Sequence, residues 1–117
     1  MTEMPGALLM VVVDVDPEHE EEFNRWYDKE HIPERLAMPG FRSARRYASH
    51  DRPGRYLAIY EIDGPDVVTS PEYLSQPMSD RSREVMATWR HLDRSVWIEI
   101  TEPMTGHEPD GSREPGA

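Results

Sequence analysis

The residues best suited to acid–base chemistry lie together in the segment Phe23–Pro33. His31 can exchange a proton near neutral pH, and the adjacent Glu30 can orient its imidazole or share the proton. On a helical wheel Glu30 falls on the same apolar side as Phe23 and Tyr27, where an unpaired carboxylate is costly. A polar group in that place indicates either a structural hydrogen bond or a polar-lined cavity. We predict that His31 and Glu30 are catalytic; the alternative is a buried structural histidine bonded to a backbone carbonyl.

A second polar pair, Arg46 and Tyr47, lies in a predicted strand, with its side chains on opposite faces. Either side chain could stabilise an enolate or phenolate oxygen of a substrate, so both join the predicted catalytic set. The alternative for this pair is an ordinary cross-strand contact or ion pair. The predicted substrate-contacting aromatics, which could instead form core or dimer interface, are Trp26, Tyr27, Tyr60 and Trp89.

Motifs for metals and cofactors are missing from the sequence. Glu30, His31 and Glu34 are suitable ligand types, but adjacent helical residues diverge by roughly 100° and no H-x-x-x-H pair is present. The absence of cysteine excludes thiolate zinc sites, iron–sulfur clusters and cysteine nucleophiles. Glycine-rich phosphate loops and dinucleotide fingerprints are also lacking. We therefore expect no metal and no cofactor, whether flavin, nicotinamide or ATP.

Length and charge narrow the class of protein. A chain of 117 residues is one domain, and its net charge of −10 is opposite in sign to that of a nucleic-acid-binding or membrane-anchoring surface. The longest apolar run, residues 7–13, is too short to span a bilayer and lacks the flanks of a signal peptide. We expect a cytoplasmic protein with one domain over residues 1–103. Residues 104–117 are predicted to be disordered, because apolar side chains are almost absent there.

Strand and helix signals alternate in the order β-α-β-β-α-β. Predicted strands cover residues 7–15, 41–51, 55–63 and 95–101, and Arg52-Pro53-Gly54-Arg55 matches a type II turn. A helix is predicted from Asp16-Pro17 to a kink or break at Pro33, with a short helical piece over 34–37. A short helix opens at Ser70-Pro71, and a longer one begins at Ser79 or Asp80 and carries Val85, Met86, Trp89 and Leu92.

This order predicts an α+β, ferredoxin-like fold, in which a four-stranded antiparallel sheet has both helices on one face. The strands carry apolar residues on both sides, as Tyr60 and Ile59 illustrate. The second face of the sheet therefore needs a cover, because a large exposed apolar patch promotes aggregation. We predict that a second copy of the chain covers it, so that a homodimer forms a dimeric α+β barrel.

The segment FNRWYDKEHIP, residues 23–33, resembles the W-Y-x-x-E-H-I/L-P signature of the EthD-like branch of the dimeric α+β-barrel superfamily. Pro39-Gly40-Phe41, Arg46-Tyr47 and the aromatic-rich strand 56–61 resemble the rest of that pattern, so the resemblance covers roughly residues 7–101. It implies ferredoxin-like monomers whose sheets pack face to face in a dimer. Relatives in the wider superfamily include cofactor-free monooxygenases, muconolactone-type isomerases and polyketide cyclases or lyases.

Two classes of function fit these residues. We favour a cofactor-independent isomerase, cyclase or lyase that acts on an aromatic or polyketide-like metabolite, with His31 as general acid/base. Cofactor-free monooxygenation is the second reaction, and a ligand-binding protein without turnover is the non-enzymatic alternative. An RNA-recognition module is disfavoured by the charge and by the missing basic-glycine-aromatic consensus. A polar-tipped cavity containing His31 would favour the enzyme, whereas a solid core there would favour neither ligand nor catalysis.

Overall fold

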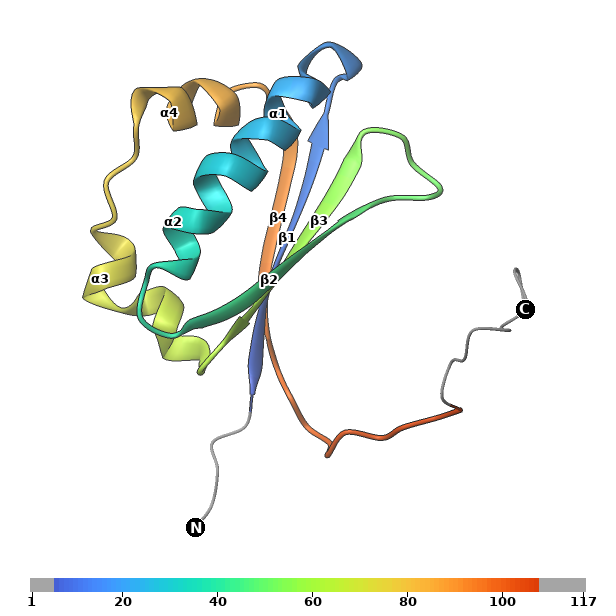
Figure 1. The fold of residues 1–117 in the computed structure, drawn as a ribbon, viewed down its shortest axis with the longest axis vertical. Helices are drawn as coiled ribbons and strands as arrows, with labels where there is room; N and C mark the ends of the chain where they lie inside the picture. Colours follow the sequence, from blue (N-terminus) through green and yellow to red (C-terminus); the bar gives the residue numbers. More distant parts are fainter. Residues whose placement is uncertain (1–5, 108–117) are drawn as a thin grey trace.

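The computed structural model describes residues 6–107 as one four-stranded antiparallel sheet with helices on one face. Its strands are β1 (Ala7–Val15), β2 (Phe41–Ala48), β3 (Arg55–Ile62) and β4 (Trp89–Ile98), in the spatial order β2-β3-β1-β4. Figure 1 shows the labelled helices on one side of this sheet and none on the other. The ferredoxin-like α+β fold is therefore confirmed.

The first helical segment is continuous across Pro33, so of the predicted kink or break at that residue the break is wrong; a π turn precedes the proline instead. It runs as η1 (Pro17–His19), α1 (Glu20–Trp26), the π-helical η2 (Tyr27–His31) and α2 (Ile32–Leu36). The amide of Ile32 donates to the carbonyl of Tyr27, five residues earlier. A proline in a regular α-helix clashes with the carbonyl four residues before it, and the wider π turn next to Pro33 relieves that clash.

The second main helix is shorter, and the last strand longer, than predicted. Helix α4 covers Asp80–Met86, and Trp89 and Leu92 belong to β4 instead of the helix. The reason lies in β1, whose C-terminal end needs a hydrogen-bonding partner: Val15 pairs with Trp89, and Val13 pairs with Leu92. Pairing between strands overrides a helical spacing of apolar residues here.

The connections between strands follow local sequence signals. Gly54 has a φ of 88°, and the amide of Arg55 donates to the carbonyl of Arg52 at 3.1 Å, as the predicted turn requires. A Cβ at Gly54 would lie 2.7 Å from the carbonyl oxygen of Val15. After β3 come η3 (Pro65–Thr69) and α3 (Pro71–Leu74), and the Ser70 hydroxyl caps α3 as expected from its sequence.

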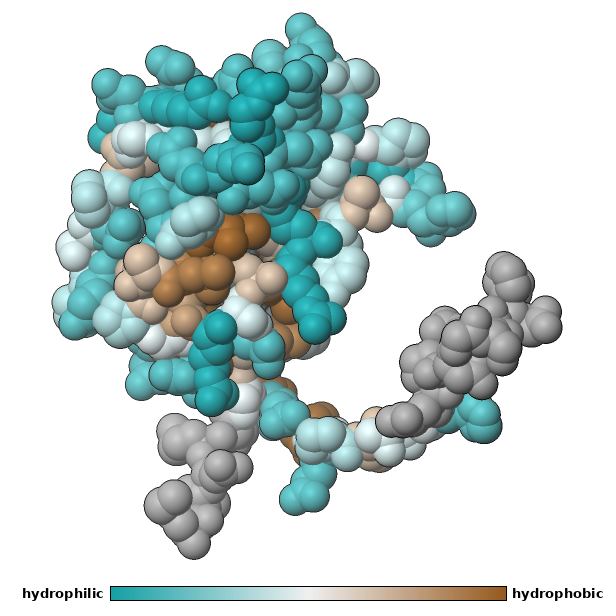
Figure 2. Space-filling view, in the orientation of Figure 1, coloured by the Kyte–Doolittle hydropathy of each residue, from teal (hydrophilic) through white to brown (hydrophobic). Residues whose placement is uncertain are grey.

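The two faces of the sheet differ in what covers them. Odd-numbered residues of β1 are buried beneath the helices, and even-numbered residues are half-buried on the other side. We call that side the open sheet face; its apolar residues are Leu8, Met10, Val12, Tyr47, Leu57, Ile59 and Trp97. Trp97 is 55% exposed there. On the opposite side, the outer surface over α1 and α4 is largely hydrophilic, while hydrophobic residues gather below α2 (Figure 2).

The segment after β4 continues to residue 107 without regular structure and with exposed side chains. Most of the predicted disordered tail, residues 108–117, lies outside the described residues. Within residues 6–107 no helix is long and apolar enough to cross a membrane.

Candidate functional site

A pocket opens between the helices and the covered face of the sheet. Its cavity volume is about 80 Å³, and the space reaches about 430 Å³ only when the solvent-filled mouth is included. Its floor comes from β1, β3 and β4, and its walls from η2, α2, α3 and α4. Aliphatic and aromatic side chains dominate the lining, and its main polar members are Tyr27, His31, Arg35, Tyr60, Trp89 and Arg94. Four of these were candidates from the sequence: Tyr27, His31, Tyr60 and Trp89.

His31 lies in this pocket with its imidazole held by aromatic rings. The ring stacks on Trp26, with centroids 4.6 Å apart and planes inclined by 22°, and meets the Tyr27 ring edge-on at 5.0 Å. Its nitrogens have no hydrogen-bond partner among residues 6–107, so the backbone-bonded structural histidine is not what the structure describes there. Burial, with a smaller contribution from the Arg35 charge, lowers the pKa of His31 to about 3. The imidazole is therefore neutral at neutral pH and can accept a hydrogen bond. It becomes a proton acceptor only when a negative charge in the pocket raises its pKa.

Two polar atoms of the lining residues are buried without a hydrogen-bond partner within residues 6–107. They are the Tyr60 hydroxyl and the Trp89 indole nitrogen. Burial, above all, raises the pKa of Tyr60; the neighbouring Tyr27 adds to the shift but does not meet hydrogen-bond geometry with it. Leaving a buried polar atom unpaired costs about 1–3 kcal/mol, so such atoms are uncommon in native proteins. Both atoms belong to residues that line the pocket.

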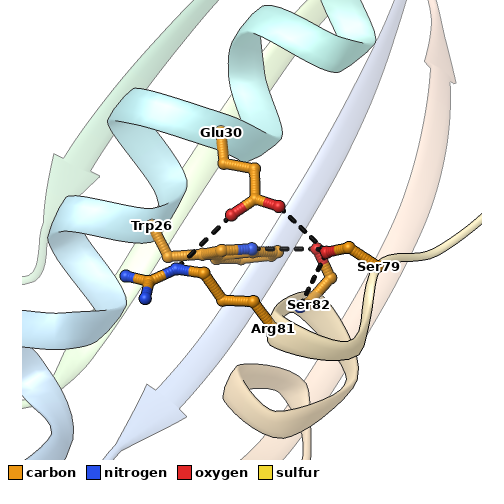
Figure 3. Close-up of polar contacts among 5 residues, drawn as sticks. All are labelled: Trp26, Glu30, Ser79, Arg81 and Ser82. Atoms are coloured by element: carbon orange, nitrogen blue, oxygen red, sulfur yellow. Dashed lines mark hydrogen bonds and ion pairs between the residues drawn. The ribbon is translucent and has the colours of Figure 1, made fainter.

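Glu30 does not pair with His31, contrary to the sequence prediction. Its carboxylate accepts a hydrogen bond from the Ser79 hydroxyl at 2.9 Å and forms an ion pair with Arg81 at 3.4 Å (Figure 3). Nearby, the Trp26 indole donates to the Ser82 hydroxyl at 3.0 Å (Figure 3). Glu30 thus ties the first helical segment to the start of α4. The wheel misplaced it because Glu30 lies in the π turn, where the regular angle per residue does not hold.

Arg46 and Tyr47, the other predicted catalytic residues, do not line the pocket. Arg46 points toward the helices and donates to Asn24 at 2.6 Å and to Asp28 at 2.8 Å. Its guanidinium lies 4.6 Å from the centroid of the Tyr27 ring, so it packs as part of the core. Tyr47 lies on the open sheet face and is 46% exposed. Trp26, a predicted substrate contact, instead supports His31 from behind.

Three pocket residues with hydrogen-bonding side chains were absent from the predicted set: Arg35, Tyr73 and Arg94. Arg35 follows His31 by four residues, which was an available helical signal. Arg94 was missed because the last strand was predicted to begin one residue after it. Tyr73 lies on the four-residue helix α3, whose packing against the sheet no local pattern indicates. Within the described part of the chain, no three His, Asp or Glu side chains gather in a way that could hold a metal ion.

The fold and pocket define a small α+β protein of the ferredoxin-like type. The chain belongs to the family described as "Domain of unknown function (DUF4286)", whose model matches residues 7–92. That match does not confirm the EthD-like branch suggested by residues 23–33. No curated protein matches the chain.

Solved structures share the fold at low sequence identity. A dimeric ferredoxin-like protein from an uncultured marine organism aligns with a TM-score of 0.67 and 13% identity, over 87% of this chain and 94% of its own. A Streptomyces coelicolor monooxygenase in complex with the ligand nanaomycin D has a TM-score of 0.65 and 14% identity, over 87% and 94%. A Mycobacterium tuberculosis protein has a TM-score of 0.62 and 19% identity, over 85% and 99%.

Proposed function

We propose that this protein is a cofactor-independent enzyme that removes a proton from an aromatic small molecule, with His31 as general base. One observation carries the proposal: a neutral, unpartnered imidazole shares a pocket with the unpartnered polar atoms of Tyr60 and Trp89. A protein that used this pocket only for packing would gain stability by pairing or removing these atoms. The presence of these unpaired polar atoms supports a ligand that forms hydrogen bonds with them.

The chemistry that fits these groups is the formation of an enolate or phenolate. A substrate with an acidic C–H conjugated to a carbonyl through an aromatic ring gives its proton to His31, and the negative charge moves to the carbonyl oxygen. The Trp89 N–H and the Tyr60 O–H can donate hydrogen bonds to that oxygen. Burial raises the pKa of Tyr60, so its hydroxyl stays protonated and can act as the donor. The new anion also favours the imidazolium that forms next to it.

Cofactor-free oxygenation is the reaction we favour for the resulting carbanion. Dioxygen adds one oxygen atom to carbon and leaves the other in water, so that R₂CH₂ and O₂ give R₂C=O and H₂O. The monooxygenase among the structural neighbours, which binds nanaomycin D, supports this choice. Isomerase, cyclase and lyase reactions begin with the same proton removal but consume no dioxygen.

The test follows the proton and the dioxygen separately, with 1,8-dihydroxyanthrone as the probe. Without oxygen, the protein is expected to accelerate exchange of the methylene hydrogens with D₂O; in air, it is expected to consume one O₂ per ketone formed. His31→Gln is expected to lower the exchange rate by about 10²–10⁴, the usual contribution of a positioned base. Glu30→Gln is the control, because Glu30 contacts α4 and not the pocket.

Exchange that is the same in His31→Gln and in the original protein would contradict the proposal. Accelerated exchange without accelerated oxygen uptake would replace oxygenation by isomerase-type chemistry. Binding of the probe without exchange would assign the pocket to a non-catalytic ligand-binding protein.

We also propose that the chain forms a homodimer through the open sheet face. This face carries Met10, Leu57, Ile59 and Trp97 among its apolar residues and has no helix over it in the described residues. The marine neighbour, described as dimeric, supports the arrangement. Light scattering should give about twice the chain mass of 13.6 kDa. Ile59→Arg, in the middle of the face, should give the monomer; a monomeric original protein at about 50 μM would contradict a standard-sized interface.

A further inference from the structure

We infer that Arg35, Tyr73 and Arg94 form a carboxylate-binding subsite at the mouth of the pocket, so that the ligand is an aromatic carboxylic acid. This inference rests on the proposed function in one respect, namely that a small molecule occupies the pocket. It goes further by assigning a negative charge to the ligand and by placing the charged group at the mouth of the pocket.

Three separate elements bring the subsite together. Arg35 comes from α2, Tyr73 from α3 and Arg94 from β4, and all three line the pocket. Arg94 donates from Nη2 to the Tyr73 hydroxyl at 2.6 Å. The guanidinium carbons of Arg35 and Arg94 lie 5.4 and 5.3 Å from the centroid of the Tyr73 ring. One aromatic ring therefore holds two cations within cation–π range.

The charges around these two arginines are unbalanced. Within residues 6–107, seven arginines form ion pairs with carboxylates. In this range Arg35 and Arg94 form none, and they share this with Arg45 and Arg52, which do not line the pocket. No Asp or Glu lines the pocket, although the chain has a net charge of −10. Besides its cation–π contact with Tyr73, the Arg35 side chain forms one hydrogen bond within residues 6–107, to the Met38 sulfur at 3.9 Å. An anionic ligand would supply the counterion that both guanidinium groups lack within residues 6–107.

The position of the pair indicates which end of a ligand it receives. Arg94 is exposed, whereas Tyr60 and Trp89 have their polar atoms buried deeper in the same pocket. A ligand with its ring system against Tyr60 and Trp89 would place a charged group at the mouth, where it remains partly hydrated. Guanidinium groups match the two oxygens of a carboxylate by forked hydrogen bonds, which favours a carboxylate over an isolated charge.

The test compares 3-hydroxybenzoate with its neutral counterpart 3-hydroxybenzamide by NMR titration of the full chain. The acid is expected to bind about 10- to 100-fold more tightly than the amide, as charge-assisted hydrogen bonds allow. Arg94→Gln and Arg35→Gln are each expected to remove most of this preference. Arg83→Gln is the matched control: it removes the same charge from an exposed ion pair on α4, outside the pocket, and should keep the preference.

Several results would overturn the subsite. Equal binding of the acid and the amide would do so, as would a preference that survives in both arginine variants, or no binding of either compound at about 10 mM. These outcomes are distinguishable from a failure of the proposed function, because His31-dependent proton exchange is measured with a probe that carries no carboxylate. A preserved acid preference without any exchange would contradict only the catalytic proposal.

Discussion

Tyr27 separates two regions of the interior that satisfy their polar groups differently. In the packed region, formed by Phe23, Arg46 and Tyr56, Arg46 donates to Asn24 and Asp28, and the Tyr56 hydroxyl donates to Glu20 at 2.6 Å. There is no room for a water molecule there. In the pocket region, formed by His31, Tyr60 and Trp89, the buried polar atoms of Tyr60 and Trp89 lack partners within the described residues, and space remains.

Both regions lie between the same helical segment and the same sheet, and both are rich in aromatic rings. They differ in whether each polar atom has found a partner inside the chain. Arg46 is a stabilising residue because its donors are used within the fold. His31 remains available for a ligand because its nitrogens are not. Polar residues near a core are therefore functional candidates only when their hydrogen-bonding groups have no partner within the fold.

Substitution in the packed region should have the largest effect on stability. Arg46→Gln should lower the free energy of unfolding by about 2 kcal/mol, because charge-assisted bonds to Asn24 and Asp28 are lost from a side chain that is only 15% exposed. Thermal unfolding at fixed protein concentration measures the change. His31→Gln is the comparison and should change stability by less, since its side chain makes no hydrogen bond in the described residues. Equal losses for the two variants would abolish the distinction.

The dependence of stability on pH should come partly from the pocket region. Burial, with the Arg35 charge, lowers the pKa of His31 from 6.5 to about 3 in the folded chain. Between these values the unfolded chain binds more protons, so stability falls as the pH drops below 6.5. Between pH 7 and pH 5 the loss due to His31 should be about 2 kcal/mol. Chemical denaturation at the two pH values should show this loss in the original protein and a smaller one in His31→Gln; an identical pH dependence would mean that His31 is solvated.

The smallest expected effect on stability comes from two tyrosine-to-phenylalanine substitutions, Tyr56→Phe and Tyr60→Phe. The two substitutions are expected to change stability in opposite directions. Tyr56→Phe removes a hydroxyl bonded to Glu20 and Asn24 and should cost about 1 kcal/mol of stability. Tyr60→Phe removes a buried hydroxyl without a partner, so stability should stay the same or rise by up to about 1 kcal/mol. Denaturant unfolding compares the two variants directly. A loss in Tyr60→Phe as large as that in Tyr56→Phe would show that the Tyr60 hydroxyl is already paired.

Local signals in the sequence were sufficient for much of the fold. The strand at residues 7–15, the turn at Gly54 and the cap at Ser70 depend on neighbouring residues, and all three are confirmed. The ends of α4 and β4 could not be predicted in this way, because Trp89 is in a strand only through its pairing with β1. Likewise, the π turn before Pro33 responds to a clash that a regular wheel ignores.

The residues of the candidate site could be predicted in part from the sequence, but the hydrogen bonds and ion pairs among them could not. Sequence reasoning placed His31, Tyr27, Tyr60 and Trp89 among the candidates, and the structure brings them to one pocket. Glu30 was expected beside His31, yet serine and arginine side chains from the distant α4 region bind it. Which polar group finds a partner depends on contacts between residues far apart in the chain, and no local pattern contains that information.

The most direct test of the pocket region uses the three indole N–H signals of the chain in one NMR spectrum. Trp26 donates to Ser82 and Trp97 donates to Ser95, whereas the Trp89 N–H has no partner among residues 6–107. When 3-hydroxybenzoate is added, the Trp89 signal should move downfield as its N–H gains a hydrogen bond, while the Trp26 and Trp97 signals should move little. A Trp89 signal that does not respond to 3-hydroxybenzoate, nanaomycin D or 1,8-dihydroxyanthrone would contradict a ligand site in this pocket.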